Sequence, residues 1–211
     1  MDIHVLYNGR LARPLPGLLL QAAGLVAGSA ASAAVLAREG VLAVVAQVMV
    51  GLAGWTLFEY ALHRWAMHCR IRKVWELLHQ QHHQMREMYN AEHRLLHPFV
   101  PLVVCGAGLA LLLRGGGAGA AVLLGYWAGY AVYELIHWAH HDVRLSEVFS
   151  RWEYYRHRAA THRDHHFRHP RANYGFTTQF WDHVFGTSLE LEGRAGASLS
   201  EHGWASRREK T

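Results

Sequence analysis

Residues 41–68 read VLAVVAQVMVGLAGWTLFEYALHRWAMH, and this stretch contains the two features that decide the fold. Its first 18 residues, Val41 to Phe58, carry no charge. A helix of this length nearly crosses a hydrocarbon core of roughly 30 Å. Its last ten residues hold one acid and two histidines, Glu59, His63 and His68. The stretch therefore predicts a membrane helix that ends in potential metal ligands.

Three more apolar runs accompany this helix, although the mean hydropathy of −0.03 conceals them. They are Leu15 to Leu36, Pro98 to Leu113 and about Ala118 to Trp138, and only short turns at residues 38–40 and 114–117 separate the neighbouring runs. Small residues such as Gly51 and Gly125 suit close helix packing in lipid. We therefore expect an all-α, multi-pass membrane protein with four transmembrane helices arranged as two hairpins. The third run has only 16 uncharged residues, so a re-entrant segment is the alternative there.

The positions of the positive charges predict the orientation of these helices. Lysine and arginine number 2 before the first run and 6 over residues 63–97, whereas each short turn holds one. The positive-inside rule then places both termini and a helical, histidine-rich cap in the cytoplasm. We expect an integral protein of a bacterial inner membrane, or of the endoplasmic reticulum in a eukaryote. No basic stripe stands apart from the membrane flanks, so the net charge of +5 does not indicate nucleic-acid binding.

The same patterns divide the chain into three segments. Residues 1–14 form an N-terminal cytoplasmic segment, and residues 15–189 form the membrane domain with its cap. Residues 190–211, with glycine, serine and mixed charges, are expected to be a loosely ordered tail. The two cysteines are too few for a disulfide framework and lack the spacing of a zinc ribbon.

Histidine is the second unusual feature, since 16 of the 18 histidines lie between His63 and His183. Four clusters stand out: His63 and His68; His79, His82 and His83; His137 and His141; and His162, His165 and His166. Positions i, i+3 and i+4 share one face of a helix, so each triplet and the third cluster point their imidazoles in one direction. His63 and His68 lie about 140° apart round a regular helix. They converge only if the helix bends or ends there.

This number of imidazoles indicates a metal centre. Neutral imidazole suits zinc, iron, copper and nickel, whereas magnesium and calcium prefer oxygen ligands. Ten clustered imidazoles exceed the four positions of a tetrahedral zinc ion, and they suit two metal ions with open positions. The alternative is that the histidines are interfacial residues without a ligand role. Two repeated triplets on one side of the membrane make that alternative the weaker one.

The clusters, in this order around two apolar hairpins, resemble the fatty acid hydroxylase/sterol desaturase superfamily of membrane di-iron oxygenases. The closing stretch is especially similar: residues 162–167 (HRDHHF), 173–176 (NYGF) and 181–187 (WDHVFGT). The resemblance covers about residues 55–190. It implies that the ten clustered histidines bind two iron ions, which zinc can replace in purified protein. It also makes residues 15–189 a membrane fatty acid hydroxylase-like domain.

The resemblance implies an enzyme that uses O2 and external electrons to hydroxylate a C–H bond of a lipid, with a fatty acyl chain as the first expectation. Desaturation, or oxidation of a sterol or carotenoid, uses the same ligands and stays an alternative. The sequence holds no fused cytochrome b5 domain, so we expect a separate electron donor that is cytochrome b5-like or ferredoxin-like.

A rival class is a zinc-binding membrane hydrolase or a metal-handling protein. Its support is weaker because the sequence has no His-Glu-x2-His motif and no serine or cysteine nucleophile motif. The histidines also lie at helix ends, whereas a transporter usually places its ligands near the middle of the bilayer.

Five further residues are expected to support the metal ligands. Glu59 and Glu134 each precede a histidine pair by a few residues, where a carboxylate can orient an imidazole or extend to the membrane interface. His140 lies beside the pair His137 and His141. Asn173 and Asp182 belong to the closing stretch and are expected to brace the cap through turn and capping bonds.

Overall fold

The structure is a computed structural model, and it describes residues 22–23, 25–26, 29–30, 33, 36–37, 40–68, 79, 118–141 and 143–189. Every regular element within these residues is a helix, which confirms the predicted helical class for this part of the chain. The predicted run from Pro98 to Leu113, the segments 1–14 and 190–211, and the side chains of His82, His83 and His141 lie outside the described part.

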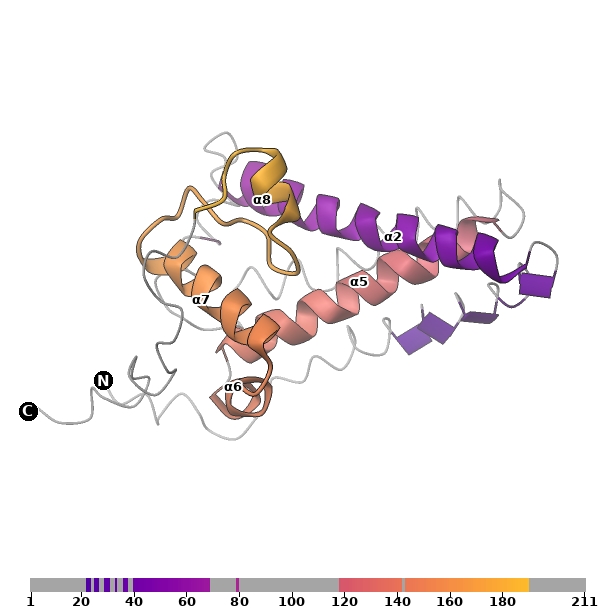
Figure 1. The fold of residues 1–211 in the computed structure, drawn as a ribbon, viewed down its shortest axis with the longest axis horizontal. Helices are drawn as coiled ribbons and strands as arrows, with labels where there is room; N and C mark the ends of the chain where they lie inside the picture. Colours follow the sequence, from indigo (N-terminus) through magenta and orange to yellow (C-terminus); the bar gives the residue numbers. More distant parts are fainter. Residues whose placement is uncertain are drawn as a thin grey trace, which may run out of the picture.

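Two long helices form the frame of the molecule. Helix α2 (Val41–Ala61) and helix α5 (Ala118–His141) lie side by side, close together at one end and further apart at the other (Figure 1). Glycine permits the close approach. A Cβ atom at Gly51 would lie 1.9 Å from the carbonyl oxygen of Val122, and one at Gly125 would lie 2.0 Å from that of Val48. The predicted role of these glycines in close helix packing is confirmed within the chain.

A Gly51→Ala variant should therefore separate the two helices. The new methyl group would meet backbone atoms, which cannot turn away as a flexible side chain can, so we expect a loss of about 1–3 kcal/mol in the free energy of unfolding. Gly54→Ala is the matched control, because its Cβ would meet only the Tyr126 ring at 3.8 Å. Thermal unfolding in detergent compares the two variants. Equal stabilities would contradict the close backbone approach.

Aromatic side chains fill the space between these helices. Trp55 on α2 and Trp127 on α5 are fully buried, and they form one core cluster with Tyr130 and Met67. The Trp55 ring lies 4.9 Å from the Tyr130 ring and 5.3 Å from the Tyr126 ring, in tilted and edge-on arrangements that aromatic pairs favour. These tryptophans therefore pack the helix pair together.

Shorter helices gather at the end where α2 and α5 are further apart. Helices α6 (Val143–Phe149) and α7 (Glu153–Phe167) follow α5, and a loop leads from α7 to α8 (Phe180–Val184) beside α2 (Figure 1). The Tyr155 hydroxyl donates to the Ala139 carbonyl at 2.8 Å and ties α7 to α5. The Trp181 indole N–H donates to the Thr56 hydroxyl at 3.0 Å and ties α8 to α2.

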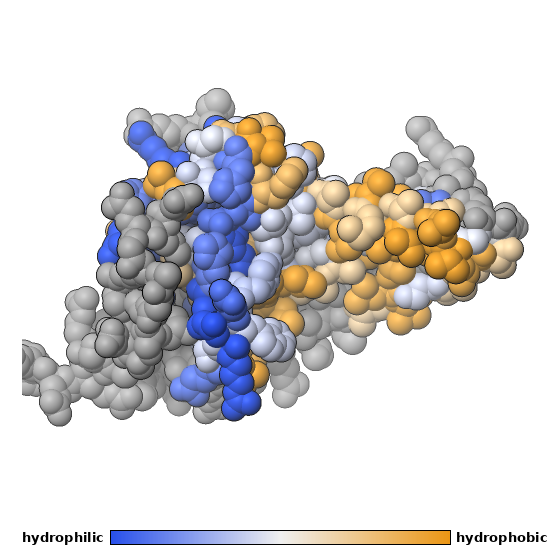
Figure 2. Space-filling view, in the orientation of Figure 1, coloured by the Kyte–Doolittle hydropathy of each residue, from blue (hydrophilic) through white to orange (hydrophobic). Residues whose placement is uncertain are grey.

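The polarity of the surface changes along the length of the α2–α5 pair. Figure 2 shows apolar residues over the narrow end of the α2–α5 pair and a hydrophilic band near the end that carries α7. Leu42, Val45, Met49 and Val50 contribute exposed apolar side chains on α2. Two helical stretches, Val41–Met67 and Gly119–His137, are long and apolar enough to cross a membrane.

Candidate metal centre

The end of α2 changes its helical geometry where the first two histidines lie. From Leu62 to Met67 the chain forms a π-helix, η2, and the His68 N–H donates to the His63 carbonyl at 3.2 Å across five residues. This wider turn brings the side chains at i and i+5 together, which a regular α-helix does not. The two Nε2 atoms lie 3.2 Å apart. The π-helix is the local change that the spacing of His63 and His68 requires, and such turns occur frequently at functional sites.

Four histidines from three parts of the sequence converge here, and we call His63, His68, His79 and His165 the four-histidine cluster. One ring nitrogen of each lies within 4.8 Å of the others. The Nε2 atom of His79 lies 3.0 Å from that of His63 and 2.8 Å from that of His68. The Nε2 atom of His165 lies 3.1 Å from that of His68. All but His68 are buried.

The dimensions of the cluster fit a metal ion. With the metal–nitrogen bonds of 2.0–2.1 Å found in zinc sites, the edge of a ligand tetrahedron is about 3.3 Å. Four of the Nε2 separations, at 2.8–3.2 Å, are slightly shorter than this edge, and all four ligand nitrogens lie within 4.8 Å of one another. An all-imidazole donor set also suits zinc, iron, copper or nickel. The cluster therefore has the donors and the spacing to hold a metal ion.

Hydrogen bonds determine the tautomers of two of these ligands. His63 Nδ1 lies 2.6 Å from the Tyr174 carbonyl oxygen, and His165 Nδ1 lies 2.7 Å from that of Ala172. A carbonyl only accepts, so each Nδ1 carries the proton. In the neutral imidazole the Nε2 atom then presents a lone pair, as metal binding requires. Both lone pairs face the interior of the four-histidine cluster.

A second group of imidazoles lies beside the first. The His162 ring is 4.3 Å from the His166 ring, 4.9 Å from the His140 ring and 5.5 Å from the His137 ring, measured between centroids. The Phe176 ring lies between the groups, 4.9 Å from His63 and 4.8 Å from His162. The structure thus places the described members of all four clusters in one region.

Two of the predicted supporting residues, Glu59 and Asp182, bind the backbone of the loop after α7. Buried Glu59 accepts hydrogen bonds from the N–H groups of Phe176 and Thr177 and from the Thr177 hydroxyl. Buried Asp182 accepts bonds from the N–H groups of Tyr174 and Gly175. Two carboxylates from two helices therefore hold residues 174–177.

Asn173 begins this loop in a left-handed conformation with φ of 56°. Asparagine tolerates that conformation better than most residues, and its Oδ1 atom accepts the Leu189 N–H at 3.0 Å. The side chain thus ties the loop to the segment after α8. Glu134 is half-buried on α5.

Several charged or titratable groups are buried near the loop. Burial raises the pKa of Asp182 above its ordinary value, although hydrogen bonds from Gly175, Thr187 and Tyr174 act in the opposite direction. Burial also lowers the pKa of Arg158, whose Nη1 atom donates to the Gly175 carbonyl at 3.3 Å. Burial, with Arg158 and Arg163 nearby, lowers the pKa of His140 to about 3, so its imidazole is neutral at physiological pH.

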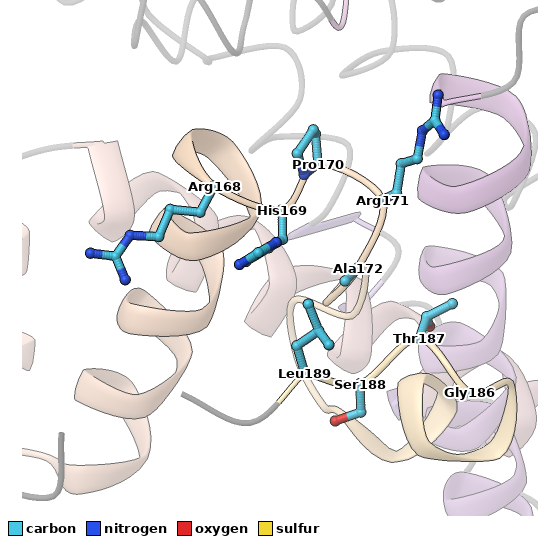
Figure 3. A pocket seen from close by; sticks show the side chains of 9 residues that line it. All are labelled: Arg168, His169, Pro170, Arg171, Ala172, Gly186, Thr187, Ser188 and Leu189. Carbon is cyan, nitrogen blue, oxygen red and sulfur yellow. The ribbon is translucent and has the colours of Figure 1, made fainter. Parts of the chain in front are cut away.

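A surface pocket of about 520 Å³ lies on another side of the same loop. It is lined by Arg168, His169, Pro170, Arg171, Ala172, Gly186, Thr187, Ser188 and Leu189, and the two arginine side chains point away from each other (Figure 3). Ala172 belongs to this lining, while its carbonyl oxygen accepts the His165 bond. Ala172 therefore takes part both in the pocket lining and in holding a residue of the four-histidine cluster.

Comparison with known proteins decides the family. The family model described as fatty acid hydroxylase matches residues 48–187, a range that includes the four-histidine cluster and the loop after α7, which we call the closing loop. The chain belongs to the fatty acid hydroxylase family. This confirms the resemblance that the histidine clusters and the closing stretch indicated.

The chain is also similar to two fatty acyl hydroxylases of other organisms. The chain is 33% identical over 162 residues to the dihydroceramide fatty acyl 2-hydroxylase FAH2 of Arabidopsis thaliana, covering 72% of this chain and 64% of that protein. It is 29% identical over 152 residues to the fatty acid 2-hydroxylase of Homo sapiens, covering 66% and 38%. The chain thus spans less than two thirds of the length of these relatives.

A solved structure supports the fold. The structure titled full-length scs7p, in which only the hydroxylase domain is visible, matches with a TM-score of 0.62 and 22% identity. The match covers 88% of this chain and 72% of that one. This family fold therefore extends over most of the chain.

Sequence reasoning missed several parts of the site. The π-helix, the carbonyl groups of Ala172 and Tyr174, buried Arg158 and the Phe176 ring carry no sequence motif of their own. The only available signal was the Asn-Tyr-Gly-Phe stretch, which marked the loop as similar to the family without indicating what its backbone binds.

Proposed function

We propose that the chain is a membrane enzyme that hydroxylates a C–H bond of a fatty acyl chain in a lipid, with O2 as oxidant. In balanced form, R–H, O2, two electrons and two protons give R–OH and water. The convergence of four Nε2 atoms in the four-histidine cluster carries the proposal, because it supplies an oxidation-resistant nitrogen ligand set in a chain of this family. The names of the relatives support a fatty acyl or ceramide substrate.

The proposed cofactor is a pair of iron ions. The four-histidine cluster would hold one, and His137, His162 and His166 would hold the second together with His82, His83 and His141, which lie outside the described side chains. When bound, iron supplies the activation of O2 and the oxidation of the C–H bond. The chain's own residues hold the ligands in place: the loop carbonyls fix two imidazoles, and Phe176 fills the space between the groups with an apolar ring that excludes water.

We expect the chain to cross a membrane four times. Both termini and the end of the molecule that carries the four-histidine cluster would then lie in the cytoplasm. The apolar α2–α5 pair and the hydrophilic band beside it support this arrangement (Figure 2). A lipid in the bilayer could then extend its acyl chain along the helices toward the metal centre. A separate electron donor of the cytochrome b5 or ferredoxin type would supply the two electrons.

Incubation of the iron-loaded protein with 18O2, a reductase system and a lipid extract tests the reaction. We expect a lipid product heavier by one 18O atom, found by mass spectrometry and absent when O2 or reductant is omitted. A product lighter by two hydrogens would identify a desaturase instead. Reducible, iron-replete protein that gives neither product with fatty acids, ceramides and sterols would overturn the proposal.

A further inference from the structure

One peptide group connects a buried carboxylate with a candidate metal ligand. The carbonyl oxygen of Tyr174 accepts the His63 Nδ1–H bond at 2.6 Å. The N–H of the same peptide bond belongs to Gly175 and donates to Asp182 Oδ2 at 2.9 Å. The order is therefore carboxylate, peptide group, imidazole, four-histidine cluster.

We propose that Asp182 is a positioning residue for the metal centre and acts on His63 through the Tyr174–Gly175 peptide group. It orients this peptide, and the peptide holds His63 so that its Nε2 lone pair is directed into the four-histidine cluster. The inference requires that the cluster binds a metal ion, as in the proposed function, but it does not depend on the substrate or on the reaction.

The physical reason is the polarity of the peptide group. Metal-bound histidines usually donate their second N–H to a carboxylate or carbonyl, which fixes the ring and makes it a stronger ligand. When the N–H of a peptide group is bonded to an anion, the carbonyl of the same peptide group is more strongly polarised, because consecutive hydrogen bonds reinforce one another in a medium of low dielectric. His63 thus receives part of the effect of a carboxylate through a neutral group.

Three hydrogen bonds to Asp182 favour its charged form and oppose the effect of burial, which raises its pKa. The N–H groups of Tyr174 and Gly175 and the Thr187 hydroxyl donate to it, at 2.8, 2.9 and 2.8 Å. A carboxylate satisfied by three donors at a fully buried position is an acceptor, not an acid O–H group. Each of these bonds favours the anion.

A chain of hydroxyl groups extends this arrangement to a cation. Arg64 Nη1 donates to the Tyr60 hydroxyl at 2.6 Å. That hydroxyl lies 2.9 Å from Thr187 Oγ1, which in turn donates to Asp182 Oδ1. With Tyr60 as donor to Thr187, all these bonds run from the guanidinium toward the carboxylate. The Arg64 guanidinium, at the start of this series of hydrogen bonds, therefore stabilises the negative charge on Asp182.

The other buried carboxylate provides a matched comparison. Glu59 also receives two backbone N–H groups and one threonine hydroxyl, from Phe176 and Thr177. The peptide group that Glu59 binds between Gly175 and Phe176 has its carbonyl bonded to Arg158, not to an imidazole. Glu59 thus holds the same loop with the same types of bond but has no histidine at the far side of that peptide.

Asp182→Asn and Glu59→Gln compare the two positions with equally conservative changes. The probe is Co²⁺ titrated into metal-free protein, with its visible absorption reporting tetrahedral nitrogen ligation, and thermal unfolding of the metal-free forms reports loop stability. We expect Asp182→Asn to lower the Co²⁺ affinity about 10- to 100-fold. Glu59→Gln should lower it less than about threefold, even where the two variants lose similar stability.

Equal losses of affinity in the two variants would overturn the proposal, because both would then act only through the loop. Unchanged affinity in folded Asp182→Asn would overturn it as well. If metal-free Asp182→Asn does not fold, Thr187→Val takes its place, since it keeps the charge of Asp182 and both backbone bonds. Loss of less than tenfold in affinity then supports the proposal, and a larger loss contradicts it. These readouts are independent of the 18O2 assay, so the proposed function and this inference can fail separately.

Discussion

Replacing His165 with alanine is expected to remove one metal ion from the protein and to abolish lipid turnover. His165 is fully buried, its Nε2 atom lies 3.1 Å from that of His68, and its Nδ1 proton is fixed by the Ala172 carbonyl. Alanine would leave three of the four imidazoles at the site. Metal content by mass spectrometry and product formation in the 18O2 assay measure the effect.

His157→Ala is the control for this variant. His157 lies on the same helix, α7, but is exposed and contacts Gln179 through its Nε2 atom at 2.9 Å. We expect wild-type metal content and turnover from this control. A His165→Ala protein that keeps both metal ions and its activity would show that the cluster is not a metal site.

A Gly175→Ala variant should disrupt the closing loop and release metal from the four-histidine cluster. A Cβ atom at this position would lie 2.0 Å from the Thr178 carbonyl oxygen and 2.9 Å from Asp182 Oδ2. The loop must move to relieve these contacts, and the Tyr174 carbonyl would move with it away from His63. We expect a loss of about 1–3 kcal/mol or more in the free energy of unfolding, together with weaker metal binding.

Thr178→Ala is the comparison within the same loop. Its hydroxyl accepts only the Phe180 N–H at 3.1 Å among the bonds of the described residues. This change should cost about 0.5–1.5 kcal/mol, as for the loss of one hydrogen bond, and leave metal affinity at the wild-type value. Thermal unfolding and metal titration of both variants separate the two effects. Equal metal affinity in Gly175→Ala and wild type would contradict the role of the loop.

The histidine pattern could be predicted from sequence because helical periodicity is a local property. Spacings of three and four residues place His162, His165 and His166 on one face whatever surrounds them. Long apolar runs identify α2 and α5 for a similar reason, since the hydrophobic effect acts on each run by itself. The predicted span from Val41 to about Leu62 differs from the structure only at its end, where η2 continues the helix to Met67.

The rest of the site depends on contacts between distant parts of the chain. Glu59 lies 117 residues before the Phe176 N–H group that it binds, and His63 lies 111 residues before the Tyr174 carbonyl. No spacing rule connects such positions, and backbone groups have no sequence signature. The sequence indicated that Glu59 and Asp182 would support the ligands. The structure shows that both carboxylates bind the backbone of the loop after α7, and that Asp182, unlike Glu59, is linked to His63 through one peptide group.

Anomalous diffraction at the iron absorption edge, on crystals of the iron-loaded protein, is the most direct test of whether the four-histidine cluster holds iron. We expect an iron peak among the Nε2 atoms of His63, His68, His79 and His165, at roughly the 2.0–2.1 Å that imidazole ligands keep from a transition metal such as zinc. A second peak is expected beside His162 and His166. Iron-replete, active protein whose peaks lie away from these nitrogens would contradict the assignment of the metal centre.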